Sequence, residues 1–241
     1  MRIRLYILLT LAAVCFAAVC LSGEVGRVST MELNSGKPVI VIDPGHGGED
    51  GGAVGLEDIR ESGINLAVSL KMDSILGLFG WPCVLTRMDE SIEYPPEAVT
   101  VKKRKQADLE RRVRLVDDTP NPILISIHQN KYPDAAPKGA QVLYRNDAGS
   151  IRLAELVQKR FIAALGKESV RSSAPISDRI YLMRKVRCTA ILVECGFLSN
   201  PAESRLLCSE EYQTKLALSM ACACAEYAKE WENAYGQGSK G

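Results

Sequence analysis

Three short runs of apolar, largely β-branched residues stand out in this sequence, and each run ends abruptly in polar residues. The runs are residues 38–42, 122–127 and 190–193. Nearly continuous apolar runs of this length are typical of strands that are covered on both faces, as they are in parallel sheets. Longer segments with helical periodicity lie between the runs. Because strand and helix alternate along the chain, we predict an α/β domain with a mostly parallel, twisted sheet of about six strands flanked by helices.

Weaker patterns predict the remaining elements of the domain. Further strands are expected at residues 83–86, 141–144 and 181–183. Helices are expected in segments where apolar residues recur three or four positions apart, at residues 64–79, 109–116, 154–164 and 210–231. The chain has 241 residues, of which 46% are hydrophobic, and this is enough for one sizeable core. We therefore expect a single domain over residues 37–230 and a flexible tail over residues 231–241. A net charge of +1 gives no reason to expect nucleic acid as a partner.

The first 23 residues have the pattern of a signal peptide or a membrane anchor. Arg2 and Arg4 precede an uncharged, mostly apolar run over residues 5–21, and Glu24 follows it. Basic residues tend to stay on the cytoplasmic side of a membrane, so the pattern predicts that the rest of the chain is exported. The run is about long enough to span a bilayer, which favours an uncleaved anchor over a cleaved signal. Residues 24–36 would then be a linker between this membrane segment and the domain.

The chain has only two histidines, and both directly follow predicted buried strands. His46 lies in a glycine-rich turn after the first apolar run, and His128 ends the second. The carboxyl ends of parallel strands meet at one edge of the sheet, which is where α/β proteins bind their ligands. Imidazole suits Zn²⁺, and a catalytic zinc ion usually has three protein ligands, often including a carboxylate. The two histidines therefore predict a zinc site that needs one more ligand.

Glu61 is a candidate for the third ligand because it begins a predicted helix downstream of the turn that carries His46. The same position would also let it interact favourably with the helix dipole without binding a metal. Other acidic residues compete for the role of third ligand: Glu49, Asp50, Glu57 and Asp58. Spacing alone does not decide between these alternatives.

Glu194 closes the third apolar run, where a carboxylate is costly to bury unless it meets a cation or a hydrogen-bond donor. Beside a zinc ion it could take a proton from the attacking water and pass it to the leaving amine. A salt bridge to Arg179 or Arg184 is the alternative. Cys195 cannot easily enter the same site as Glu194, because adjacent strand residues point to opposite faces. It belongs to a set of body cysteines that lack C-x-x-C spacing and are expected to be free thiols: Cys83, Cys188, Cys195, Cys208, Cys222 and Cys224.

Several motifs together resemble one known family, the zinc-dependent N-acetylmuramoyl-L-alanine amidases of bacterial cell-wall metabolism. They are Val41-Ile42-Asp43-Pro44-Gly45-His46-Gly47-Gly48, Glu61 with Asn65-Leu66, Leu85-Thr86-Arg87, Ser126-Ile127-His128-Gln129-Asn130 and Leu192-Val193-Glu194-Cys195-Gly196-Phe197-Leu198-Ser199-Asn200. The resemblance covers nearly all of residues 38–227. It implies that His46, Glu61 and His128 bind one zinc ion and that Glu194 is catalytic. It also implies peptidoglycan as the substrate, with Asn130 and Arg87 as candidate supporting or substrate-binding residues.

The short chain, the single N-terminal segment and the stretch at residues 103–109 most resemble the germination-specific, spore-cortex branch of this family. That branch implies an exported enzyme, anchored or secreted into the space around the developing spore, that prepares the glycan for muramic δ-lactam formation. Cys195 departs from the small or aliphatic residue expected at its position. The basic run at residues 102–105 is expected in a solvated loop, with contact to wall polymer as the alternative. Another zinc peptidase of wall peptides and a non-catalytic wall-binding protein remain alternative functions, and the need for an accessory protein is open.

Overall fold

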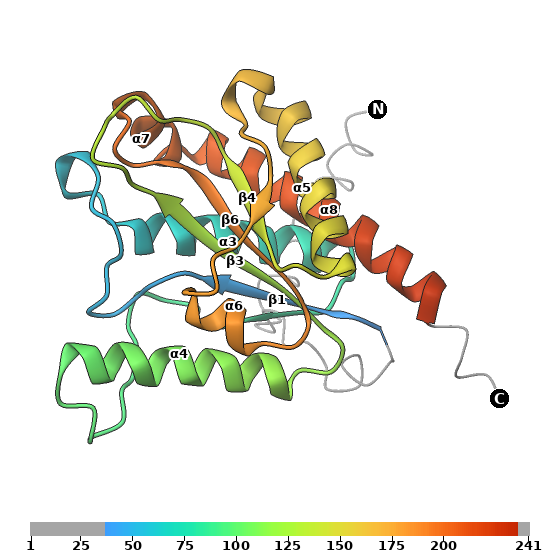
Figure 1. The fold of residues 1–241 in the computed structure, drawn as a ribbon, viewed down its shortest axis with the longest axis horizontal. Coiled ribbons are helices and arrows are strands. Elements are labelled where there is room, and N and C mark those ends of the chain that lie inside the picture. The colour runs from blue at the N-terminus through green and yellow to red at the C-terminus, as the bar shows by residue number, and fades with distance from the viewer. Residues whose placement is uncertain (1–36, 236–241) are drawn as a thin grey trace, which may run out of the picture.

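A six-stranded sheet runs through the centre of the computed structural model, which describes residues 37–235 of the chain (Figure 1). In spatial order its strands are β2 (Cys83–Leu85), β1 (Val39–Pro44), β3 (Pro122–Asn130), β6 (Thr189–Phe197), β4 (Gln141–Tyr144) and β5 (Ala174–Pro175). Neighbouring strands are parallel except β4 and β6, which are antiparallel. The predicted α/β domain with a mostly parallel sheet is confirmed.

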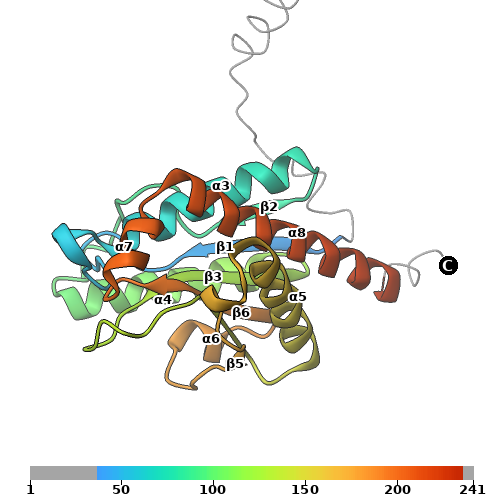
Figure 2. The same ribbon diagram turned by 90° about the horizontal axis from the view of Figure 1, so that it is seen from above.

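Helices cover both faces of this sheet and form a three-layered domain (Figure 2). On one face lie α3 (Glu61–Leu78), α5 (Ala148–Leu165) and α8 (Glu210–Tyr235). On the other face lie α4 (Val101–Asp118) and the short α6 (Tyr181–Lys185). The connections contain three further short helices, which are η1 (Leu56–Asp58), η2 (Lys167–Ser169) and α7 (Pro201–Leu207). The four predicted helices are thus all present.

The central strands are apolar at consecutive positions because the sheet has a hydrophobic core on each side. In β1, Ile40 and Ile42 join the core under α3, α5 and α8, while Val41 between them joins the smaller core under α4 and α6. All three side chains are fully buried. Alternate strand residues point to opposite faces, so a strand between two helical layers must be apolar at every position.

Two predicted elements are wrong. Residues 181–183 were expected in a strand, but they form the first part of α6, and the sixth strand is the two-residue β5. A three-residue apolar stretch has no readable periodicity, and β5 exists only because Ala174 pairs with Leu143 of the distant β4. The basic run at residues 102–105 is not a loop either, because α4 already begins at Val101, where the Thr100 side chain caps it by accepting from the Lys103 amide.

The predicted membrane segment (residues 1–23) and linker (residues 24–36) lie outside the described residues, as does the chain beyond residue 235. The last helix, α8, continues to Tyr235 and so passes the expected domain end at residue 230. Within the described part of the chain, no helix combines the length and the apolar character needed to cross a membrane.

Candidate metal centre

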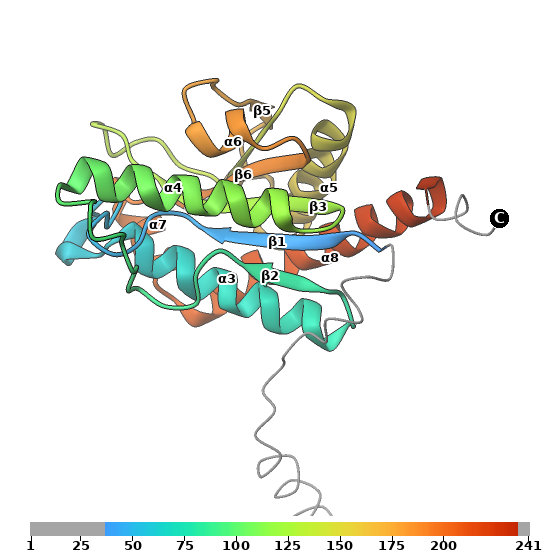
Figure 3. The same cartoon turned by 90° about the horizontal axis from the view of Figure 1, so that it is seen from below.

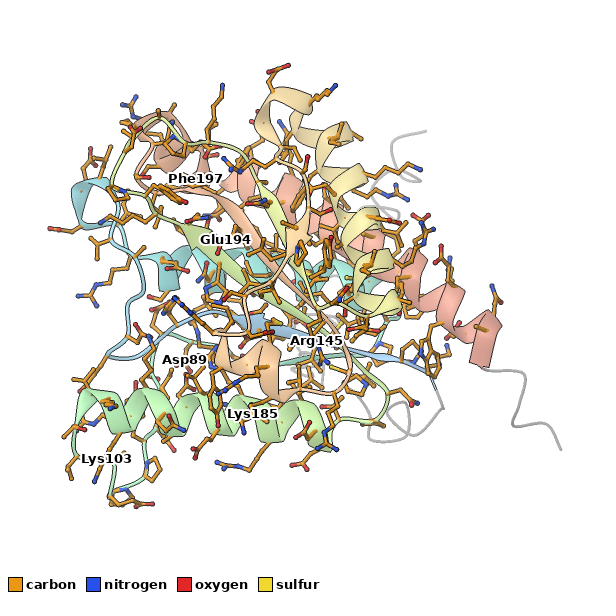
Figure 4. All side chains as sticks on the ribbon, viewed as in Figure 1. Asp89, Lys103, Arg145, Lys185, Glu194 and Phe197 are labelled. Carbon is orange, nitrogen blue, oxygen red and sulfur yellow. The ribbon has the colours of Figure 1, made fainter. Side chains whose placement is uncertain are left out.

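The two histidines lie together at the carboxyl edge of the central strands. His46 is in the loop that leaves β1, and His128 lies near the end of β3, the neighbouring strand. Glu194 is the partner of His128 in the pairing of β3 with β6, so its backbone lies directly beside that histidine. The first residue of α3 is Glu61, and it reaches the same place from the helical layer. Figure 4 shows Glu194 near the middle of the fold, on β6.

His46, Glu61 and His128 form a compact group in which one ligand atom of each residue lies within 4.8 Å of the others. Glu61 Oε1 is 2.9 Å from His128 Nδ1, and Glu61 Oε2 is 3.3 Å from His46 Nε2. The carboxylate is almost completely buried, and the backbone amides of Ala53 and Gln129 also donate to it. Glu61 therefore bridges the two rings instead of merely facing the start of its helix.

The acidic residues that competed with Glu61 in the sequence have other surroundings. Glu49 pairs with Arg104, while Glu57 and Asp58 are exposed in η1. Asp50 does contact His46, but it does so through Nδ1, at 3.0 Å from its Oδ2. Asp50 therefore lies on the Nδ1 side of the His46 ring and leaves Nε2 to face Glu61.

The charges of this group match those of a cation site. Burial lowers the pKa of His46, but hydrogen bonds to Asp50 and Glu61 outweigh it and raise the pKa to about 9. Burial favours the neutral form of Glu61, yet hydrogen bonds from His128 and His46 hold its pKa well below the ordinary value. In the metal-free protein, a proton on His46 supplies positive charge beside the carboxylates of Glu61 and Asp50. A divalent cation bound here would supply that positive charge in place of the proton.

Glu194 is half-buried, and one oxygen of its carboxylate is buried without a hydrogen-bond partner in the described part of the chain. Burial raises its pKa to about 7. Its Oε2 has no hydrogen-bond partner among the described residues, and no ion pair joins it to Arg179 or Arg184 there. A buried, unpaired carboxylate oxygen is costly unless a ligand, ion or water satisfies it. Glu194 therefore fits a site whose remaining partner is a metal ion and substrate.

Two glycines leave the space that the group needs. A Cβ on Gly45 would lie within 2.6 Å of three atoms of the His128 ring. A Cβ on Gly52 would lie 2.6 Å from Glu61 Oε2, and this residue also has a positive φ of 70° that favours glycine. The backbone at both positions thus packs directly against the candidate ligands.

The group opens into a cavity of about 490 Å³ between the sheet, α4 and α6. His46, His128 and Glu194 line this cavity, and Asn130 is also part of the lining. Arg87 is not. It is buried behind the loop after β1, where it donates to the carbonyl oxygens of Pro44, Gly45 and Ser62. This position favours support of the loop over contact with a substrate.

Sequence analysis missed several residues that hold the loop carrying His46. Arg112 of α4 is fully buried and pairs with Asp43 at 2.7 Å and with Asp108 at 2.8 Å. Lys105, from the basic run, pairs with Asp50 at 2.7 Å. Helical spacing places these residues of α4 on one face of the helix, and residues 103–109 contributed to the family resemblance, but neither signal connects them with the loop that carries His46.

Two imidazoles and a carboxylate at the carboxyl edge of an α/β sheet, with an unpaired carboxylate beside them, make up the arrangement of a mononuclear metal hydrolase. The chain belongs to the N-acetylmuramoyl-L-alanine amidase family, whose model matches residues 40–226, and it is an enzyme of that kind. The family resemblance drawn from the motifs is confirmed.

Individual relatives narrow the comparison. The chain is 36% identical over 197 residues to the germination-specific N-acetylmuramoyl-L-alanine amidase of Bacillus subtilis, and the match covers 81% of each chain. Its fold is similar to that of the CwlD amidase from Clostridioides difficile, solved in complex with the GerS lipoprotein. That match has a TM-score of 0.75 and 32% identity, and it covers 80% of this chain and 99% of the other. The catalytic domain of the amidase CwlV from Bacillus (Paenibacillus) polymyxa var. colistinus follows with a TM-score of 0.68, 30% identity, and coverage of 80% and 98%.

Proposed function

We propose that this amidase uses one zinc ion, bound by His46, Glu61 and His128, to hydrolyse the amide between N-acetylmuramic acid and L-alanine in peptidoglycan. The observation that carries the proposal is the convergence of three ligand atoms within 4.8 Å, in the same cavity as the unpaired carboxylate of Glu194. Two imidazoles and one carboxylate are a donor set that zinc hydrolases use, and they leave a position open.

Glu194 is the proposed acid and base of the reaction. Zinc in this site would polarise the scissile carbonyl and make the attacking water more acidic. The Glu194 carboxylate takes the proton of that water and then delivers it to the nitrogen of L-alanine as the bond breaks. In the metal-free protein burial raises the pKa of Glu194 to about 7, and a carboxyl group in this range can both accept and return a proton at neutral pH.

Product analysis tests this reaction against another zinc peptidase. The purified protein, loaded with zinc, is incubated with peptidoglycan, and the products are separated by mass. Peptides with a free amino-terminal alanine are the expected product, whereas release of a terminal alanine alone would identify a carboxypeptidase. Glu194→Gln keeps the shape of the side chain and removes its base, so it should bind zinc normally and lose activity. Absence of both zinc and hydrolysis in the wild type would favour a wall-binding protein.

We further propose that the enzyme is exported, is held at a membrane by residues 5–21, and acts on spore cortex before muramic δ-lactam is made. The similarity to a germination-specific amidase supports the cortex as the site of action. The CwlD structure holds that amidase with a lipoprotein, which supports an accessory protein as a partner. Muropeptide analysis of spores that lack the gene tests the proposal, because normal levels of muramic δ-lactam would contradict it.

A further inference from the structure

One face of α4 is turned towards the loop that carries His46. Lys105, Asp108 and Arg112 lie on this face, because residues three, four and seven positions apart share one side of a helix. We call these three residues the α4 clamp and residues 43–50 the metal loop. Figure 3 shows α4 running alongside β1 and β3, next to this loop. Val116 is the only fully buried apolar side chain of the helix, and Asp108 and Arg112 are buried with it.

Arg112 makes four hydrogen bonds in the clamp, with all three of its nitrogens taking part. A guanidinium has five N–H donors. Nε donates to Asp108 Oδ2 at 2.8 Å, and Nη1 donates to Asp43 Oδ1 at 2.7 Å. Nη2 forms an ion pair with the same Asp108 oxygen, also at 2.8 Å. Two further hydrogen bonds reach main-chain carbonyl oxygens of the metal loop, from Nη1 to Pro44 at 2.7 Å and from Nη2 to His46 at 2.6 Å. A lysine has three donors on a single nitrogen and cannot reproduce this fork.

The contact with the His46 carbonyl matters because the backbone of that residue is unusual. His46 has a φ of 61°, in the left-handed region that residues with a side chain rarely adopt. Such a conformation persists only when the surroundings fix it. Arg112 binds the carbonyl on one side, and the neighbouring Gly47 amide donates to the Asp50 carbonyl at 2.8 Å. The main chain of His46 is therefore held in place from α4.

The ring of His46 is held from the same helix through one intermediate. Lys105 Nζ is 2.7 Å from Asp50 Oδ2, and this same oxygen is 3.0 Å from His46 Nδ1. A carboxylate bound to the far nitrogen of a ligand histidine fixes both the orientation of the ring and its tautomer. Lys105 in turn fixes the carboxylate. The two ends of the clamp thus define where Nε2 of His46 points.

We propose that the α4 clamp positions His46 for the metal: Arg112 fixes its main chain, and Lys105, acting through Asp50, fixes its ring. This inference rests on the proposed zinc site and adds to it the residues that make one ligand ready to bind. None of the three clamp residues is itself a ligand. Their effect is on zinc affinity, because a histidine that must be ordered during binding holds the ion less tightly.

The experiment measures the zinc dissociation constant of the folded protein by competition with a chelator. Lys105→Met is the main variant, and Lys215→Met on α8 is its matched control. The two lysines have side chains that are 51% and 49% exposed, and each makes one ion pair of 2.7 Å with a carboxylate. Loss of the carboxylate that contacts a ligand histidine directly, here Asp50, typically weakens metal binding 10- to 100-fold. Lys105 acts one contact further out, so its loss should cost less. We therefore expect Lys105→Met to bind zinc measurably more weakly, by up to about tenfold, and Lys215→Met to bind like the wild type.

The direction in which Lys105→Met changes zinc affinity distinguishes positioning of His46 from a simple effect of charge. Removal of a positive charge near a cation site would by itself strengthen zinc binding, whereas loss of positioning weakens it. Lys105→Met should have no further effect in a protein that already carries Asp50→Asn, because the lysine acts through that carboxylate. Arg112→Lys keeps the charge and loses the fork, so it should also weaken zinc binding at temperatures where the apo-protein is fully folded.

Equal zinc affinity in the wild type, Lys105→Met and Arg112→Lys would overturn the clamp and leave the proposed function intact. A wild type that binds no zinc would instead remove the proposed function itself. An Arg112→Lys protein that does not fold leaves the decision to the half-exposed Lys105, whose replacement leaves no charge buried without a partner.

Discussion

Substitution of Gly45 by alanine tests the geometry of the site with a single methyl group. The new Cβ would lie within 2.6 Å of three atoms of the His128 ring, well inside van der Waals contact. The backbone of Gly45 cannot easily retreat. Its amide donates to the Ile127 carbonyl at 2.9 Å, and its own carbonyl accepts from Asn65 at 3.0 Å and from Arg87 at 3.1 Å. The ring of His128 must therefore move.

The size of this movement sets the expected effect. Non-bonded carbon atoms rest at about 3.5 to 4.0 Å, so the ring must shift by about 1 Å or more. Metal ligands keep their distances to within about 0.2 Å, and a ligand displaced this far no longer completes the site. Overpacking of this kind costs roughly 1 to 3 kcal/mol of folding free energy. We expect Gly45→Ala to lower the melting temperature of the apo-protein by several degrees and to abolish both zinc binding and hydrolysis.

Gly77 provides the matched control for this substitution. It is exposed within α3, and a Cβ there would meet nothing within 4 Å. Alanine is the better helix former, so Gly77→Ala should stabilise the protein by up to about 1 kcal/mol and leave zinc binding unchanged. The assays are thermal unfolding with and without zinc, chelator competition and release of peptide from peptidoglycan. Wild-type zinc affinity and activity in Gly45→Ala would refute the reasoning.

Three further predictions concern protons and the metal. Zinc must replace a proton at His46, whose pKa is about 9 in the metal-free protein, so calorimetry in buffers of different ionisation enthalpy should show about one proton released near pH 7.5. Burial raises the pKa of Asp43, but Arg112, Ser126 and Thr86 outweigh it and lower the pKa from 3.8 to about 2. A carboxyl group whose pKa is lower in the folded protein stabilises the fold at pH values above its pKa in the unfolded chain. The free energy of unfolding in urea should therefore fall by about 2 kcal/mol as the pH falls from about 4 to 2, and Asp43→Asn should lack this pH-dependent component. Zinc at about 1,000 times its dissociation constant should stabilise the protein by roughly 4 kcal/mol, and a chelator should reverse this shift in thermal unfolding.

The parts of the site that sequence analysis predicted are those that local pattern determines. His128 lies near the end of a strand that is buried on both faces, so its place at the sheet edge follows from the apolar run before it. The spacing of Glu61 left its role open, because what brings it to His128 is a contact across 67 positions. Arg112 and Asp43 are separated by 69 positions, and no periodicity marks a buried ion pair over such a distance.

The wrong predictions have the same physical cause. Residues 181–183 and the basic run at residues 102–105 are short segments whose structure depends on what packs against them. Leu182 and Met183 are both buried under α4, which a helix allows and a half-exposed strand does not. Lys105 was expected to be fully solvated. About half of its side chain is exposed, but its ammonium group forms an ion pair with Asp50 of the metal loop.

The two histidines of the proposed zinc site are held by different kinds of structure. His128 belongs to β3, which pairs with β1 on one side and β6 on the other, so the sheet itself fixes its backbone. His46 lies in a loop and has a left-handed backbone conformation. Its backbone is held by side chains of α4, whereas the backbone of His128 is held by hydrogen bonds to neighbouring strands. A displacement of α4 would therefore reach the metal through His46 and leave His128 in place. Since α4 also lines the cavity, a substrate or partner that moves this helix would change substrate binding and zinc affinity together.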